Sequence, residues 1–111
     1  DPAGFRHELS WGQYLSPGSF VPGRPMSGFK TGDQGMGHIV LLVPDLRAAD
    51  RFYREVMGFK ASDCIMDGAR ELLFYHCNGR HHSLAIGNCL LEKPRQDPSL
   101  KRSYEGGFEL D

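Results

Sequence analysis

The chain has 111 residues, of which 40% are hydrophobic and 24% are charged, and its formal net charge is -1. This composition is ordinary for one soluble globular domain with a modest core. It contains no basic stripe and no apolar run that is long enough to span a bilayer, so we expect neither nucleic acid nor a membrane as a partner. The first residues lack the order of a basic region followed by an apolar one, so we expect no signal peptide.

Three cysteines, Cys64, Cys77 and Cys89, form an odd set without a CxxC pair. This count disfavours a disulfide framework or a zinc knuckle, and it predicts reduced thiols in a cytoplasmic protein. We expect each cysteine to be a small buried apolar residue.

The first third of the chain shows few signals of regular structure. Residues 1–12 begin with a turn and then alternate loosely between apolar and polar side chains, which predicts a short strand. Residues 13–35 are rich in Pro, Gly and Ser and have no steady period, so we interpret them as a linker. A linker of this length is unusual so near the start of a complete domain and ordinary in a chain that begins inside a larger protein.

A strand and a helix follow the linker. Residues 36–43 form a near-continuous apolar run, which predicts a buried strand that Pro44 ends. Asp45 is a favourable N-cap residue, and helical spacing begins there. Gly58 stands where a helix needs a left-handed residue to end. The apolar stripe of this helix consists of Leu46, Ala49, Phe52, Tyr53, Val56 and Met57.

Three further strands are predicted after the helix. Residues 59–66 and 70–77 are separated by Asp67-Gly68, a tight-turn signal, and Asn78-Gly79 is a second one before the strand at 81–87. The fold class is therefore α+β, with the order strand, helix and three strands. Residues 89–111 contain two prolines and many charges without a period, and we expect them to be irregular.

Strand alternation assigns the first histidine to a face. The apolar stripe of the helix needs an apolar partner, which Ile39, Leu41 and Val43 supply. His38 and Val40 then lie on the opposite face of the sheet.

The same alternation assigns the later histidines. Phe74 is in phase with His76, and His82 is in phase with Leu84 and Ile86, while His81 points the other way. If the sheet curls away from its helix, His38, Phe74 and His82 line one concave surface with apolar walls and imidazoles, which is typical of a small-molecule site. A lone histidine on an apolar strand is nevertheless more often a hydrogen-bonded core residue than a metal ligand. Solvation beside a turn equally explains His76 and His81, and the pattern by itself names no reaction.

Two long segments carry a resemblance. GMGHIVLLVPDLRAADRFYREVMGF, residues 35–59, and FYHCNGRHHSLAIG, residues 74–87, resemble the opening and the histidine hairpin of the catalytic domain in type I extradiol ring-cleaving dioxygenases of the dihydroxybiphenyl branch. DPAGFRHELSWGQ, residues 1–13, resembles the last strand of the metal-free domain that precedes it. Residues 21–35 resemble the connection between the two domains.

The resemblance implies a fold and an activity. The family belongs to the vicinal oxygen chelate superfamily, whose strand-helix-strand-strand-strand modules curl around a metal. Residues 1–12 would be the terminal strand of a preceding domain, residues 13–35 the interdomain linker, and residues 36–88 the first module of the catalytic domain. The family cleaves catechols beside their hydroxyl groups with Fe(II) and O2, holding the iron with two histidines and a carboxylate. Its members are usually homo-oligomers.

The resemblance also implies roles for particular residues. His38 matches the first iron ligand. His82 matches a histidine beside bound oxygen that acts in proton transfer, a role that suits an imidazole because its pKa lies near working pH. Val40 and Phe74 match positions that line the pocket for the substrate ring. His76 and His81 belong to the motif but receive no role.

The match breaks after His82, because no further histidine follows and residues 89–111 do not resemble the family, apart from a faint likeness of GGFELD that puts Asp111 near the carboxylate position. One histidine cannot hold iron in a facial site, so we expect an incomplete module, a fragment of a dioxygenase that is inactive by itself. One alternative is a non-catalytic module that binds aromatic ligands, as in the bleomycin resistance proteins. Another is that two chains pool their ligands at an interface.

Overall fold

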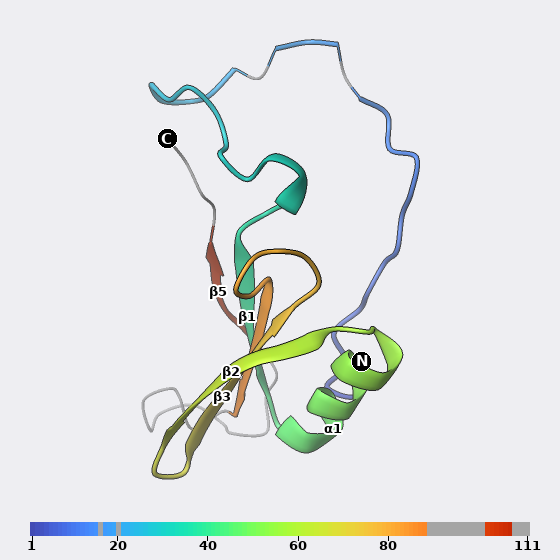
Figure 1. Ribbon diagram of the computed structural model, residues 1–111, viewed down its shortest axis with the longest axis vertical. Coiled ribbons are helices and arrows are strands. Elements are labelled where there is room, and N and C mark those ends of the chain that lie inside the picture. Colours follow the sequence, from blue (N-terminus) through green and yellow to red (C-terminus); the bar gives the residue numbers. More distant parts are fainter. Residues whose placement is uncertain (16, 20, 89–101, 108–111) are drawn as a thin grey trace.

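The computed structural model describes residues 1–15, 17–19, 21–88 and 102–107, and Figure 1 shows their arrangement. The predicted order of strand, helix and three strands is confirmed, and a further strand follows it. The elements are η1 (Gly32–Gln34), β1 (His38–Val43), α1 (Leu46–Arg51), η2 (Phe52–Val56), β2 (Lys60–Asp67), β3 (Arg70–His76), β4 (Leu84–Asn88) and β5 (Arg102–Gly107). None of the helices in this described part of the chain has the length and hydropathy needed to cross a bilayer.

The helix begins and ends where the sequence predicts. The Asp45 side chain accepts a hydrogen bond of 2.9 Å from the Ala48 backbone N–H, which satisfies one of the donors that a helix leaves open at its start. The wider π turn of η2 continues α1 without a break. Gly58 then adopts a φ of 75°, and the helix ends there. Glycine adopts this left-handed conformation at little energetic cost because it has no Cβ atom.

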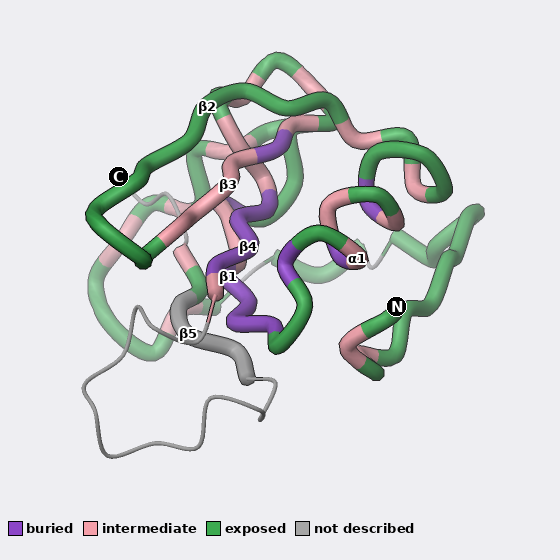
Figure 2. Tube along the Cα trace, turned by 90° about the horizontal axis from the view of Figure 1, so that it is seen from below, coloured by how far each residue is buried: buried purple, intermediate pink, exposed green. Residues whose placement is uncertain are grey.

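The strands form one sheet in the order β2-β3-β4-β1-β5, which can be followed in Figure 2. β1 and β4 are parallel, whereas the β2–β3, β3–β4 and β1–β5 pairs are antiparallel. β1 and β4 are therefore central and mostly buried, and β2 is an edge strand that is exposed along its whole length.

The hydrophobic core lies on the side of the sheet that α1 covers. As predicted, Leu41 and Val43 face the helix, with Ile39 packed beside them. The remaining buried members are Leu46, Ala49, Tyr53, Tyr75, Leu84 and Ile86. Both tyrosines are buried, and the hydroxyl group of each donates a hydrogen bond. Tyr75 donates to Asp50 Oδ1 at 2.7 Å. Burial raises the pKa of Tyr53 to about 12, and burial together with the Asp50 hydrogen bond raises the pKa of Tyr75 as well.

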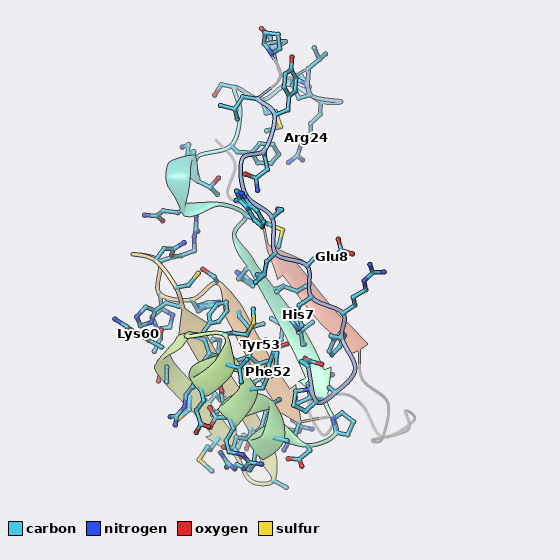
Figure 3. The ribbon with its side chains drawn as sticks, turned by 90° about the vertical axis from the view of Figure 1, so that its right-hand side faces the viewer. His7, Glu8, Arg24, Phe52, Tyr53 and Lys60 are labelled. Atoms are coloured by element: carbon cyan, nitrogen blue, oxygen red, sulfur yellow. The ribbon has the colours of Figure 1, made fainter. Side chains whose placement is uncertain are left out.

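The strand predicted for residues 1–12 is absent, so this prediction is wrong. The chain turns at once, with the Gly4 N–H donating to the Asp1 carbonyl, and the segment forms no ladder with either edge of the sheet. It docks instead on the helix side, where Ala3 and Phe5 pack against the core and the Tyr53 hydroxyl donates to Asp1 Oδ2 at 2.6 Å. Figure 3 shows His7 pointing toward Tyr53, and its Nε2 lies 3.2 Å from the hydroxyl oxygen.

The two predicted turns differ. The first is confirmed: Asp67 pairs with Arg70, and Gly68 takes a φ of 59° between them. The second is not a tight hairpin, because the connection spans residues 77–83 and β4 begins at Leu84 rather than at residue 81. Asn78 uses its side chain to shape this loop, accepting from Arg80 N–H and donating to the Gln34 carbonyl.

The prediction of an irregular region over residues 89–111 is wrong for residues 102–107, which form β5 on the open edge of β1. This segment pairs with β1, which is distant in the sequence, so its strand could form without an alternating pattern of apolar residues. Residues 89–101 and 108–111, including Cys89 and Asp111, lie outside the described residues. The expectation of buried cysteines is also wrong for Cys64 and Cys77, which are exposed free thiols.

Candidate functional site

Three aromatic rings meet at the start of β1, and they are the three that the sequence predicted to share a surface. The His38 and His82 ring centroids are 4.8 Å apart, and those of Phe74 and His82 are 4.9 Å apart. His38 opens β1, Phe74 lies in β3, and His82 belongs to the loop before β4. All three residues are partly buried. We call these three residues the ring cluster.

The ring cluster lies on the face of the sheet opposite α1. Ile39 and Leu41 pack toward the helix, so their neighbours His38 and Val40 point to the other face. Leu73 and Tyr75 likewise pack toward the helix, which places Phe74 on the same face as His38. The predicted separation of imidazoles from the helix is therefore confirmed for β1 and β3.

Val40 lies on this face too, at some distance from Phe74. Both residues pair with Ala85 of β4, one from each side, so the three side chains form a row across the sheet. Two strand spacings separate Val40 from Phe74, roughly 10 Å. Ala85 between them is fully buried and Val40 is 5% exposed, so this row is covered for most of its length.

The predicted phase of the fourth strand is wrong. His82 was expected on the same face as Leu84 and Ile86, yet those two residues belong to the core on the helix side. His82 reaches the ring cluster because it precedes the strand, and the alternation of a strand does not extend into a loop. His81 also turns toward this face, with its ring centroid 6.1 Å from that of Phe74.

Two polar partners of the histidines were not predicted. The Nδ1 atoms of His81 and His82 are 2.9 Å apart, and His81 Nε2 lies 3.9 Å from Asp63 Oδ2. Asp63 pairs with Phe74 across β2 and β3. A signal for this was present in the sequence, since counting back along both strands from the Gly68 turn brings position 63 close to position 74.

His76 has a separate environment. Its Nδ1 forms a short hydrogen bond with the Ser62 hydroxyl on the neighbouring strand β2. His76 thus has its own hydrogen-bond partner beside the ring cluster.

Gly107 of β5 lies directly against His38. The two residues are cross-strand partners, and a Cβ atom at position 107 would lie 2.6 Å from His38 Cε1 and 2.9 Å from Nδ1. Real Cβ atoms essentially never come this close to a non-bonded heavy atom, so a side chain at position 107 would require the imidazole to shift. The position of the His38 ring thus depends on β5 as well as on His82.

The ring cluster by itself does not provide the ligands of an iron site. An imidazole is a suitable ligand for Fe(II), but a facial site needs three protein ligands. Within the described ranges, no three His, Cys, Asp or Glu side chains lie close enough to share one metal ion. His38 alone does not fit the group, and any iron held there would need ligands from beyond the described residues.

Two cavities of the described structure lie apart from the ring cluster. One of about 300 Å³ lies on the helix side, between Phe5, His7, Tyr53 and Met57. Another of about 360 Å³ lies among Arg47, Arg54 and the β2–β3 hairpin. Neither is lined by His38, Phe74 or His82.

Comparison with known proteins identifies the family of the module. Residues 35–87 match the family model described as the Glyoxalase/Bleomycin resistance protein/Dioxygenase superfamily. The chain is 45% identical over 94 residues to biphenyl-2,3-diol 1,2-dioxygenase of Pseudomonas sp. (strain KKS102), covering 78% of this chain and 31% of that protein. It is 45% identical over 92 residues to 3-methylcatechol 2,3-dioxygenase of Pseudomonas putida F1, covering 78% of this chain and 32% of that protein.

A solved structure of a catechol dioxygenase also resembles this chain. The crystal structure of BphC, a halotolerant catechol dioxygenase, superposes with a TM-score of 0.83 and 64% identity, covering 100% of this chain and 35% of that chain. The module of residues 35–87 therefore belongs to the glyoxalase, bleomycin resistance protein and dioxygenase superfamily. Its homologues within that superfamily are extradiol catechol dioxygenases, and the chain spans about a third of their length.

Proposed function

We propose that this chain forms part of the active site of an Fe(II)-dependent extradiol dioxygenase that cleaves catechol-type rings with O2 in aromatic catabolism. The ring cluster is the observation on which this proposal rests. It joins two imidazoles and a phenyl ring on the open face of a module whose relatives are ring-cleaving enzymes.

Each residue has a role in this proposal. His38 supplies one imidazole ligand to iron, and the remaining ligands come from beyond the described residues. Phe74 and Val40 line the pocket for the ring of a dihydroxylated substrate, the first as a partly exposed aromatic ring and the second as an apolar side chain that is 5% exposed in this chain. His82, in contact with both other rings, accepts or returns a proton of the substrate hydroxyl groups.

We further propose that the protein acts in the cytoplasm and assembles as a homo-oligomer. The exposed free thiols of Cys64 and Cys77 support a reducing compartment. The long exposed edge β2 supports contact with another chain or segment, because an unpaired strand edge favours pairing.

A chimera tests the catalytic role. Residues 35–87 replace the matching segment of the biphenyl-2,3-diol 1,2-dioxygenase of strain KKS102, which restores the rest of the site. We expect the chimera to bind Fe(II) and to convert biphenyl-2,3-diol into a yellow ring-cleavage product, followed by absorbance. His38→Ala should abolish both iron binding and product, whereas His76→Asn should retain both. The 111-residue chain alone should give no turnover.

A folded, iron-loaded chimera that leaves biphenyl-2,3-diol intact would refute the proposal. Binding of an aromatic ligand by the unmodified chain, equally tight with and without a chelator, would instead support the alternative of a non-catalytic binding module.

A further inference from the structure

The His81 side chain lies between the ring cluster and a carboxylate. Its Nδ1 is 2.9 Å from His82 Nδ1, and its Nε2 is 3.9 Å from Asp63 Oδ2. The two imidazole planes are nearly perpendicular, at 87°, with their centroids 5.2 Å apart. Asp63, His81 and His82 therefore form a row that ends at the ring cluster.

This geometry restricts where the imidazole protons reside. A hydrogen bond between two Nδ1 atoms requires one ring to donate and the other to accept. The Asp63 carboxylate favours a proton on the His81 nitrogen that faces it, which is Nε2. A neutral His81 then accepts through Nδ1, so His82 donates through Nδ1–H and its Nε2 carries the lone pair.

The Phe74 ring keeps the two histidines in place. Its centroid lies 4.9 Å from that of His82 and 6.1 Å from that of His81, so it packs against both members of the pair. His76 is a different case, because its Nδ1 is bonded to the Ser62 hydroxyl. Of these two motif histidines without a role, the structure therefore connects His81 to the ring cluster.

We infer that His81 is a positioning residue that holds His82 in the Nδ1–H tautomer, with Asp63 orienting His81. Its significance for catalysis rests on the proposed function, because in that tautomer Nε2 is the His82 nitrogen without a proton. The arrangement follows a general pattern in which a base is oriented by a second group and that group by a third.

The tautomer can be measured on the 111-residue chain without iron or substrate. Long-range 1H–15N NMR distinguishes a protonated imidazole nitrogen from one with a lone pair, and His82→Ala assigns the signals. At a pH where the imidazoles are neutral, we expect the Nδ1–H form of His82 to predominate. In His81→Ala the ratio of Nδ1–H to Nε2–H should fall by about 2- to 10-fold, the range that one net hydrogen bond supports.

Two variants separate positioning from folding. His81→Asn keeps an acceptor oxygen near the place of Nδ1 and should restore the ratio, whereas His76→Asn should leave it unchanged. Asp63→Asn removes only the carboxylate charge and should lower the ratio less than His81→Ala does. Asp63 and His81 are exposed and His76 is partly exposed, so circular dichroism should show the same fold for each variant.

An unchanged His82 ratio in folded His81→Ala would overturn the inference, and so would a failure of His81→Asn to restore it. The proposed function fails separately, if the iron-loaded chimera cleaves no catechol. A tautomer shift without catalysis by the chimera would leave the positioning role intact and remove its catalytic meaning.

Discussion

The two faces of the sheet use the same strands for different purposes. On the face toward α1, Leu41, Tyr75 and Ile86 are buried in a continuous apolar cluster, and the buried hydroxyl groups of Tyr53 and Tyr75 have carboxylate partners. On the other face, His38 and His82 are partly exposed, and a glycine rather than a side chain supports the His38 ring. Along β1, His38 thus belongs to the ring cluster, whereas its neighbour Ile39 packs against the core.

This difference shows how stability and chemistry are divided in a small module. Apolar burial toward the helix is a large source of stabilising free energy. The opposite face can therefore keep imidazoles accessible, at a cost that the core offsets. Substitutions on the two faces should accordingly have different consequences.

The largest effect is expected on the helix side. Ile86→Ala should lower the free energy of unfolding by about 2–5 kcal/mol, because it leaves a cavity in the fully buried centre of β4. Ile65→Ala is the matched control, since Ile65 is 53% exposed on β2 and should change stability by no more than about 0.5 kcal/mol. Urea denaturation of both variants measures the difference. Equal losses would contradict the placement of the core.

Gly107→Ala should give the next largest effect, through the ring cluster. A methyl group would meet the His38 ring, so we expect a loss of about 1–3 kcal/mol from overpacking. Gly106→Ala is the control, because its nearest neighbour would be the His38 carbonyl oxygen at 4.0 Å. In a His38→Ala background the loss should disappear, as a double-mutant cycle measures. If Gly107→Ala still lowers stability in that background, glycine is needed there for the conformation of β5 and not to make room for His38.

The smallest effect concerns pH. Tyr53 has its pKa raised to about 12 by burial, above the value near 10 of an unfolded chain. The folded protein therefore retains a proton that the unfolded chain loses, so the stability from this group is complete below about pH 10 and is lost as pH rises toward 12. Tyr53→Phe should make the decline of stability with pH shallower. The remaining decline should come from the buried Tyr75, whose pKa is also raised. Thermal unfolding between pH 8 and 12 tests it, and an unchanged slope would contradict a buried, neutral Tyr53.

Much of the module was predictable because its signals are local. The Asp45 cap, the left-handed Gly58 and the turn at Gly68 each depend on a few neighbouring residues. The segment 1–12 shows the limit of such patterns. Its loose alternation resembled a strand, but a strand needs a partner, and none of the sheet's edges pairs with this segment.

The ring cluster was predictable in its membership and only partly in its geometry. His38 and Phe74 were placed on the right face, because each is in a strand whose neighbours face the helix. His82 lies on the same surface because of the path of the loop before β4, and strand alternation does not explain its position. The His81–Asp63 contact requires the β2–β3 register, and the roles of His38, Val40, Phe74 and His82 remain predictions to be tested.

The sequence by itself determined the succession of β1, α1, β2, β3 and β4, with the exception of their ends, and which face of β1 meets the helix. These features follow from short-range backbone preferences and from the period of apolar side chains. Only the tertiary structure decided that β5 joins β1, that Gly107 makes room for His38, and that His81 approaches both His82 and Asp63. Such contacts join residues that are far apart in the chain or that lie in loops, where no repeating pattern fixes the direction of a side chain.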